Sequence, residues 1–79
     1  MKGKERASAE FRDLLAWRIE EAMDRHPELT HQDWAFLWGC GVATVSRIRT
    51  GRCVPSVERL CLIADALDVS LDWLCGRVN

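Results

Sequence analysis

The sequence predicts an all-α fold, a compact domain of five helices. Apolar residues recur at three- and four-residue steps, helix-capping residues recur along the chain, and no segment alternates polar and apolar residues as a strand does. The 79 residues leave room for one domain. No run approaches the ~18 apolar residues that cross a bilayer, and the polar start lacks the apolar region of a signal peptide. We therefore expect a cytoplasmic protein that does not bind membranes.

The first helix is expected from Ser8, a plausible N-cap, to about Arg25, where His26-Pro27 ends it. Its apolar face comprises Phe11, Leu14, Leu15, Ile19, Ala22 and Met23. Trp17 projects from the opposite side, so we expect it to be exposed, either as an ordinary surface residue or as a protein contact. Residues 8–79 are assigned to the domain and residues 1–7 to a basic arm. The charges of the arm, Lys2, Lys4 and Arg6, either contact a polyanion or only keep the chain soluble.

Two short helices and a tight turn are predicted in the middle of the chain. Thr30 and Asp33 have the spacing of a capping box, and the second helix then presents the apolar residues Trp34, Ala35, Leu37 and Trp38. Gly39 ends this helix because glycine readily adopts the left-handed conformation. A third helix starts near Val42 and ends at Gly51. Val45 and Ile48 point to one side of it, and Val42, Ala43, Ser46 and Arg47 to the other.

Two more helices complete the chain. After the loop at residues 52–55, Ser56 caps a fourth helix that Asp68-Val69 breaks. Its expected apolar face is Val57, Leu60, Cys61, Ala64 and Leu67, with Leu62 opposite and exposed. Ser70 caps a last turn that contains Leu71, Trp73 and Leu74 and ends at Gly76.

Positive charge is concentrated in two segments, although the net charge is only −1. Residues 1–7 carry +2 and residues 35–55 carry +3, because Arg47, Arg49 and Arg52 are accompanied there by no acid. Residues 8–34 carry −4 and residues 56–79 carry −2. This distribution fits a protein with one face for a polyanion, or simply a solvated basic loop.

The four cysteines give little chemistry. The gaps between Cys40, Cys53, Cys61 and Cys75 hold 12, 7 and 13 residues, which matches no zinc-ligand spacing. We expect reduced thiols, with Cys75 the one prone to crosslinking, and no metal or other cofactor. Metal or redox sensing is a minor alternative. No nucleophile, base and orienting group come together in the motifs, so an enzyme is not expected.

Residues 31–49 have the pattern of a helix-turn-helix, which places its second helix in the DNA major groove, although similar turns also occur in structural bundles. Arg47 can pair with the O6 and N7 atoms of guanine. Thr44 and Ser46 can hydrogen-bond, whereas Val42 and Ala43 can touch thymine methyl groups. Arg52 and the helix N-termini can hold phosphates.

From Leu29 to Gly76 the sequence resembles the lambda-type phage repressor family, also called the Cro/CI or XRE helix-turn-helix family. The similar segments are LTHQDWAFLWGCGVATVSRIRTG and PSVERLCLIADALDVSLDWLCG. The resemblance implies a lambda-repressor-like DNA-binding domain that regulates transcription, usually as a homodimer on a near-palindromic operator. Known dimers of this kind place their recognition helices about 34 Å apart.

The resemblance also implies site residues. His31 stands where the family often has Gln, Gly41, Val42, Ala43 and Arg47 face base edges, and Thr50 and Arg52 meet the backbone. The predicted contact set is His31, Gln32, Gly41, Val42, Ala43, Thr44, Ser46, Arg47, Arg49, Thr50 and Arg52. Few of the base-facing residues can hydrogen-bond, so direct readout rests on Arg47 and DNA shape supplies the rest.

Arg49 departs from the family, in which a Glu at this place often pairs with an Arg at the end of the first helix. The nearest first-helix candidates here are Met23 and Asp24. We expect either a reversed pair between Asp24 and Arg49 or an Arg49 that reaches phosphate.

The family's usual dimer contact implies an interface at Leu71, Trp73, Cys75 and Val78. The leading functional hypothesis is a phage or prophage repressor, associated with the nucleoid, that occludes promoter DNA. The alternative is an antitoxin or adaptor whose tryptophan-rich exterior holds a protein partner and which regulates its own operon.

Overall fold

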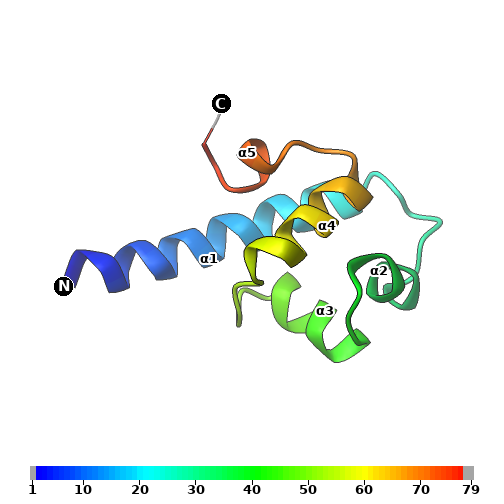
Figure 1. Ribbon diagram of the computed structural model, residues 1–79, viewed down its shortest axis with the longest axis horizontal. Helices are drawn as coiled ribbons and strands as arrows, with labels where there is room; N and C mark the ends of the chain where they lie inside the picture. Colours follow the sequence, from blue (N-terminus) through cyan, green and yellow to red (C-terminus); the bar gives the residue numbers. More distant parts are fainter. Residues whose placement is uncertain (1, 78–79) are drawn as a thin grey trace.

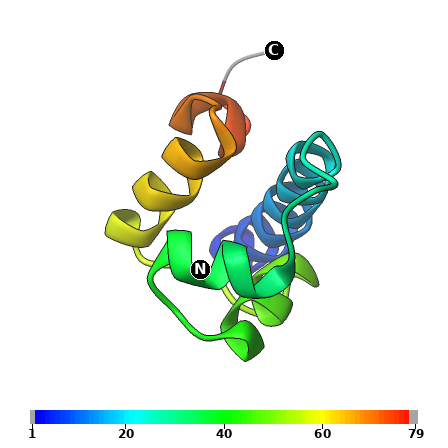
Figure 2. The same cartoon turned by 90° about the vertical axis from the view of Figure 1, so that its right-hand side faces the viewer.

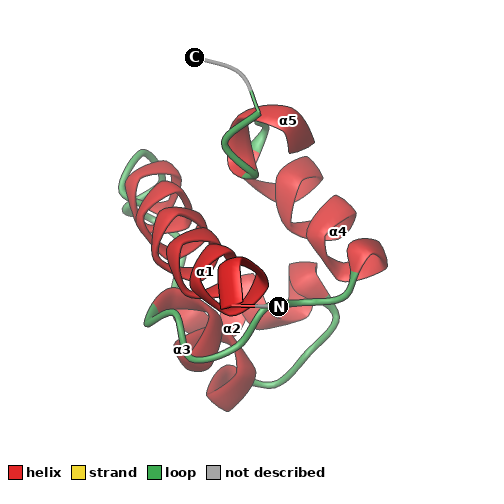
Figure 3. Cartoon of the chain, turned by 90° about the vertical axis from the view of Figure 1, so that its left-hand side faces the viewer, coloured by secondary structure: helices red, strands yellow, loops and turns green. Residues whose placement is uncertain are grey.

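The computed structural model describes the backbone of residues 2–77 and the side chains from residue 9 onward. Its helices are α1 (Lys2–Met23), α2 (His31–Trp38), α3 (Val42–Arg49), α4 (Val57–Leu67) and α5 (Leu71–Leu74). Within this part of the chain the only regular elements are these helices, which confirms the all-α prediction (Figures 1 and 3). No helix in it combines the length and hydropathy that crossing a bilayer requires.

The first helix begins earlier than the sequence suggests. The prediction that Ser8 caps it is wrong, because α1 begins at Lys2 and continues through Ser8 without a break. The backbone of residues 2–7 is thus helical, and the first turns of α1 extend beyond the other elements (Figure 1). Ser8 stays helical because Ala7, Ala9 and Glu10 around it have good helix propensity. The side chains of Lys2, Lys4 and Arg6 lie outside the described residues.

The predicted caps of the shorter helices are present. The N–H of Asp33 donates to Thr30 Oγ1 at 3.2 Å, and the Thr30 N–H donates back to Asp33 Oδ2 at 2.8 Å. Ser56 and Ser70 accept from the N–H groups three residues on, at 3.2 Å and 3.0 Å. Gly39 ends α2 in the left-handed region with φ 71°. Local side-chain chemistry therefore defines where these helices begin and end.

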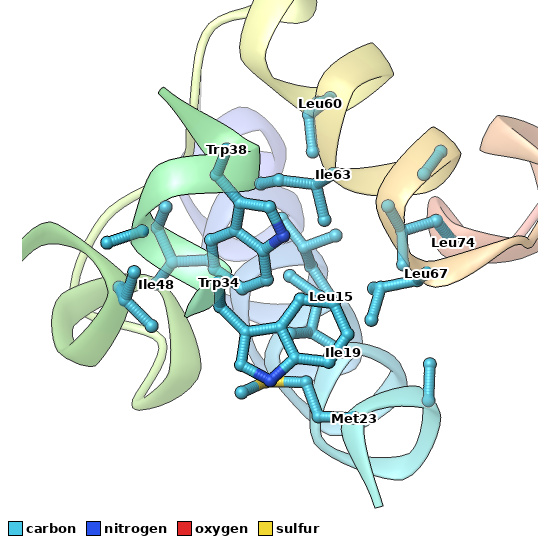
Figure 4. Close-up of a cluster of buried hydrophobic side chains, with 14 residues drawn as sticks. Leu15, Ile19, Met23, Trp34, Trp38, Ile48, Leu60, Ile63, Leu67 and Leu74 are labelled. Atoms are coloured by element: carbon cyan, nitrogen blue, oxygen red, sulfur yellow. The ribbon is translucent and has the colours of Figure 1, made fainter. Parts of the chain in front are cut away.

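The core lies where α1, α2 and α4 meet, with α3 and α5 closing its two ends (Figures 2 and 4). Trp34 and Trp38 of α2 are buried in its centre, facing the leucine and isoleucine side chains of the neighbouring helices (Figure 4). The fully buried large side chains are Trp34, Trp38, Leu15, Ile19, Ile48, Ile63, Leu74 and Val45. Burial of large apolar side chains is the main term that stabilises a domain of this size.

Three apolar assignments of the sequence analysis are wrong. Leu37, Val57 and Cys61 were expected inward, and all three are exposed. In α4 the inward face is Leu60, Ile63, Ala64 and Leu67. Compared with the predicted face, α4 is rotated slightly about its axis, so that Ile63 points inward and Cys61 outward. Burial of the larger isoleucine removes more apolar surface from water.

Exposure of Trp17 and Leu62 is confirmed, at 57% and 43%. Phe11 and Leu14, predicted on the inner face of α1, are only half-buried. Gly76 packs directly on Leu14, since a Cβ there would overlap Leu14 Cδ2, and its φ is 76°. Both the space and the backbone conformation favour glycine at the end of α5.

Candidate nucleic-acid interface

The two sides of α3 have the polarity that the sequence predicts. Val45 and Ile48 are buried against the core, whereas Val42, Ala43, Ser46 and Arg47 are exposed. Because residues four apart share a helix face, Ala43 and Arg47 lie one turn from each other on the outer side. This side of α3 is free to enter a groove of DNA.

A recess of about 370 Å³ is hollowed into this outer side. It is lined by Ala43, Ser46, Arg47, Thr50 and Arg52, five members of the predicted contact set, and by no acidic residue. The Thr50 hydroxyl donates to the Ser46 carbonyl at 2.9 Å, and the Arg52 N–H donates to the Arg47 carbonyl at 2.8 Å. These hydrogen bonds to main-chain carbonyls fix the C-terminal end of α3, where Arg47 and Arg52 line the same recess.

The start of α3 is also open. Gly41 is its N-cap in extended conformation and makes no side-chain cap, and a Cβ on Gly41 would meet nothing within 4 Å. The first amide groups of a helix lack intrahelical acceptors and favour an anion such as phosphate. A nucleic-acid backbone can therefore approach this end of the helix closely.

Not all of the predicted contact residues lie at this recess. His31 and Gln32 are exposed at the start of α2, and His31 lines a second hollow of about 270 Å³. That hollow also contains Glu20 and Asp24 of α1, so its charge is mixed. Thr44 is half-buried at the side of α3 and is less available to a ligand than Ser46.

Arg49 is paired within the protein. Its Nη2 lies 2.8 Å from Oε2 of Glu20, and its side chain is 27% exposed. The predicted partner Asp24 is wrong by one helical turn, because Glu20 and Asp24 share one face of α1 and the packing of α3 against α1 brings Arg49 to Glu20. The pair nevertheless has the predicted reversal of charges relative to the family, with the acid on α1 and the arginine on α3.

The sequence analysis missed the role of Arg59. From the first turns of α4, its Nη1 donates to the carbonyls of Trp38 at 2.8 Å and Gly39 at 2.7 Å. These carbonyls belong to the turn that joins α2 to α3. The contact spans twenty residues, so no local sequence pattern could have predicted it.

The residues predicted at a dimer interface are partly covered by the chain itself. Leu71, Trp73 and Cys75 are half-buried and pack against the core, and Val78 lies outside the described residues. The Arg18 guanidinium lies 4.7 Å from the centre of the Trp73 ring, and its Nη1 donates to the Trp73 carbonyl at 3.1 Å. Trp73 thereby holds α5 on α1.

The cysteines have free thiols, and Cys61 is the exposed one. Burial, together with the nearby Asp72 carboxylate, raises the pKa of the Cys75 thiol. Cys75 is half-buried and Cys61 is exposed, so Cys61 is the more accessible of the two thiols. Among the described side chains, those of residues 9–77, no three His, Cys, Asp or Glu gather as a metal site would require.

Comparison with known proteins adds two findings. Residues 19–74 match the family model described as Helix-turn-helix, HTH_3. A segment of 39 residues is 41% identical to the cryptic phage CTXphi transcriptional repressor RstR of Vibrio cholerae serotype O1. That segment covers 49% of this chain and 35% of RstR, so the similarity spans about a third of the relative. No solved structure matches the chain.

Proposed function

This chain belongs to the XRE/Cro-CI type helix-turn-helix family, and we propose that it represses transcription by binding operator DNA. The observation that carries the proposal is the recess on α3, where Arg47 and Arg52 stand exposed with no acid beside them. A duplex is the polyanion whose groove admits such a helix. The similarity to a phage repressor supports a phage or prophage origin.

Arg47 is the residue that reads sequence in this proposal. Its long side chain can donate two hydrogen bonds to the O6 and N7 atoms of one guanine, while Val42 and Ala43 touch thymine methyl groups. Arg52 and the α3 N-terminus hold backbone phosphates, and Thr50 joins them when its hydroxyl turns from the Ser46 carbonyl toward a phosphate oxygen. His31 and Gln32, exposed at the start of α2, contact the backbone beside the same groove.

The family and the small size of the site support a homodimer on a near-palindromic operator. One α3 reads only a few base pairs, so two copies are needed for a specific operator. The contact between copies is placed at Leu71, Trp73, Cys75 and Val78, the last of which lies outside the described residues. The basic residues of positions 1–7 add phosphate contacts at the flank. We place the protein on the nucleoid in the cytoplasm.

Selection from a random duplex library tests the proposal. The purified protein is equilibrated with the library at near-physiological salt, and the retained duplexes are sequenced. We expect an enriched near-palindrome with centres about one helical turn apart. If a folded sample enriches no sequence, operator binding by the protein alone is overturned. If it enriches only a single half-site, the dimer is overturned.

An antitoxin or adaptor role is the second candidate, and the exposed aromatic side chains favour it. Trp17 is 57% exposed on α1 and Phe36 is 86% exposed on α2. The exterior is less rich in tryptophan than expected, because Trp34 and Trp38 are buried. Co-purification of the product of a neighbouring gene, lost on Phe36→Ser or Trp17→Ser, would support this role.

A further inference from the structure

Arg59 lies at the junction of three helices. It belongs to the first turns of α4, and its guanidinium reaches the end of α2 just before the chain turns into α3. A single nitrogen, Nη1, donates to the carbonyls of Trp38 and Gly39, at 2.8 Å and 2.7 Å. Both distances are in the range of strong, charge-assisted hydrogen bonds.

The carbonyls that Arg59 binds need such a partner. The last carbonyls of a helix have no intrahelical donor, and the C-terminal end of the helix dipole attracts a cation. The last turn of α2 contains no basic residue of its own. Arg59 supplies from α4 the positive charge and the hydrogen-bond donor that the sequence of α2 lacks.

The turn that Arg59 holds contributes to the orientation of α3, together with the packing of Val45 and Ile48 in the core. Gly39 adopts φ 71°, and only two residues, Cys40 and Gly41, separate it from Val42, the first residue of α3. So short a connection passes any rotation of the Gly39 peptide directly to the recognition helix. The hydrogen bonds of Arg59 fix that peptide against α4, which is itself anchored in the core through Leu60 and Ile63.

The surroundings of Arg59 differ from those of the arginines on α3. Arg59 lines a separate hollow with Gly39, Ser56, Glu58 and Leu62, none of which lines the recess of Arg47 and Arg52. Glu58 makes this hollow less attractive to a phosphate. The guanidinium is also turned toward the protein, as its two acceptors are both main-chain carbonyls.

We propose that Arg59 is a positioning residue for DNA reading, which orients α3 by bonding the Trp38 and Gly39 carbonyls and does not touch the DNA. This inference rests on the proposed function, because it assigns a role within operator recognition. It distinguishes Arg47 and Arg52, which bind the operator, from Arg59, which orients α3.

The test compares Arg59→Met, which keeps the aliphatic stem, Arg59→Lys, which keeps the charge and one donor group, and Arg52→Met as the matched control for a phosphate contact. For each folded variant, affinity for the selected operator and for a scrambled duplex is measured at several salt concentrations. Backbone amide exchange at residues 39–41 is measured on the same samples without DNA.

For Arg59→Met we expect operator affinity to fall about tenfold, the value of one charge-assisted hydrogen bond, with scrambled-duplex affinity unchanged. The slope of log affinity against log salt stays the same, whereas Arg52→Met lowers it by about 0.9 for each bound protomer. Arg59→Lys recovers most of the loss. Faster amide exchange at residues 39–41 accompanies Arg59→Met and not Arg52→Met.

Two results would overturn the proposal. One is a folded Arg59→Met with unchanged operator affinity, and the other is a salt slope reduced as in Arg52→Met, which would make Arg59 a phosphate contact. If Arg59→Met does not fold, Arg59→Gln, which keeps a donor group and removes the charge, is judged by the same two criteria. If the native chain selects no operator, the proposed function fails, and amide exchange alone still tests the hold of Arg59 on the turn.

Discussion

The two faces of α3 differ in what their side chains interact with. On the inner face, Val45 and Ile48 are completely covered by the core. On the outer face, Ala43, Ser46 and Arg47 border the recess and are exposed. The inner face therefore determines where the helix sits, and the outer face what it binds. One helix of eight residues carries both tasks without sharing a residue between them.

The arginines of this region show the same division. Arg49 is paired with Glu20, and Arg59 with two carbonyls at the end of α2. Among residues 9–77, the guanidinium groups of Arg47 and Arg52 have no protein partner. An arginine whose guanidinium already has partners holds the fold, whereas one without remains available for a phosphate or a base. Substitutions on the two sides should consequently affect different measurements.

The largest effect is expected from Ile48→Ala on the inner face. It leaves a cavity beside Trp34 and Trp38, and such truncations cost about 2–5 kcal/mol of the free energy of unfolding. That is a large share of the stability of a small domain. Urea unfolding followed by tryptophan fluorescence measures the loss. A midpoint equal to that of the native chain would contradict the division between faces.

Arg47→Ala on the outer face should change recognition and leave stability alone. We expect the unfolding midpoint to stay constant, while preference for the selected base facing Arg47 falls by about 1–3 kcal/mol, the discrimination of one bidentate contact. Competition between the selected operator and single-base variants measures it. Binding with an unchanged sequence preference would remove Arg47 from the reading role.

Arg52→Ala should act on affinity for all duplexes alike. The loss of one phosphate contact in each bound protomer lowers the slope of log affinity against log salt by about 0.9 per protomer and does not change sequence preference. A salt titration with selected and scrambled duplexes measures both quantities. An effect confined to the selected duplex would show that Arg52 contacts a base.

The smallest effect is expected from the ion pair of Glu20 and Arg49. Both side chains are partly exposed, so solvent screens the pair, and such pairs contribute about 0.2–1 kcal/mol. A double-mutant cycle with Glu20→Gln and Arg49→Gln measures this coupling through urea unfolding. The matched cycle with Asp24→Gln should give none. Coupling of Arg49 to Asp24 in place of Glu20 would place the pair one helical turn away.

What the sequence could predict depended on how local the determining contacts are. The caps at Thr30, Ser56 and Ser70 and the turn at Gly39 involve neighbours within a few residues, and they were predicted correctly. The division of α3 into an inner and an outer face followed from helical periodicity in the same way. These features locate the helix-turn-helix and most of the recess.

The features that the sequence could not predict depend on contacts between distant segments. Whether Cys61 or Ile63 of α4 points inward depends on how α4 rests against α1 and α2, because both choices fit a helical period. The partner of Arg49 depends on the packing of α3 against α1. The hold of Arg59 on Gly39 has no trace in the sequence near either residue.

The recess on α3 has a consequence for how this protein can diverge. Ala43, Ser46, Arg47 and Arg52 line it without belonging to the core. When two sites share no contact partners, the effects of their substitutions on the free energy of unfolding are independent and additive. A lineage can therefore exchange these side chains one at a time, changing what the outer face binds at each step, while Val45, Ile48 and the two buried tryptophans keep the same scaffold.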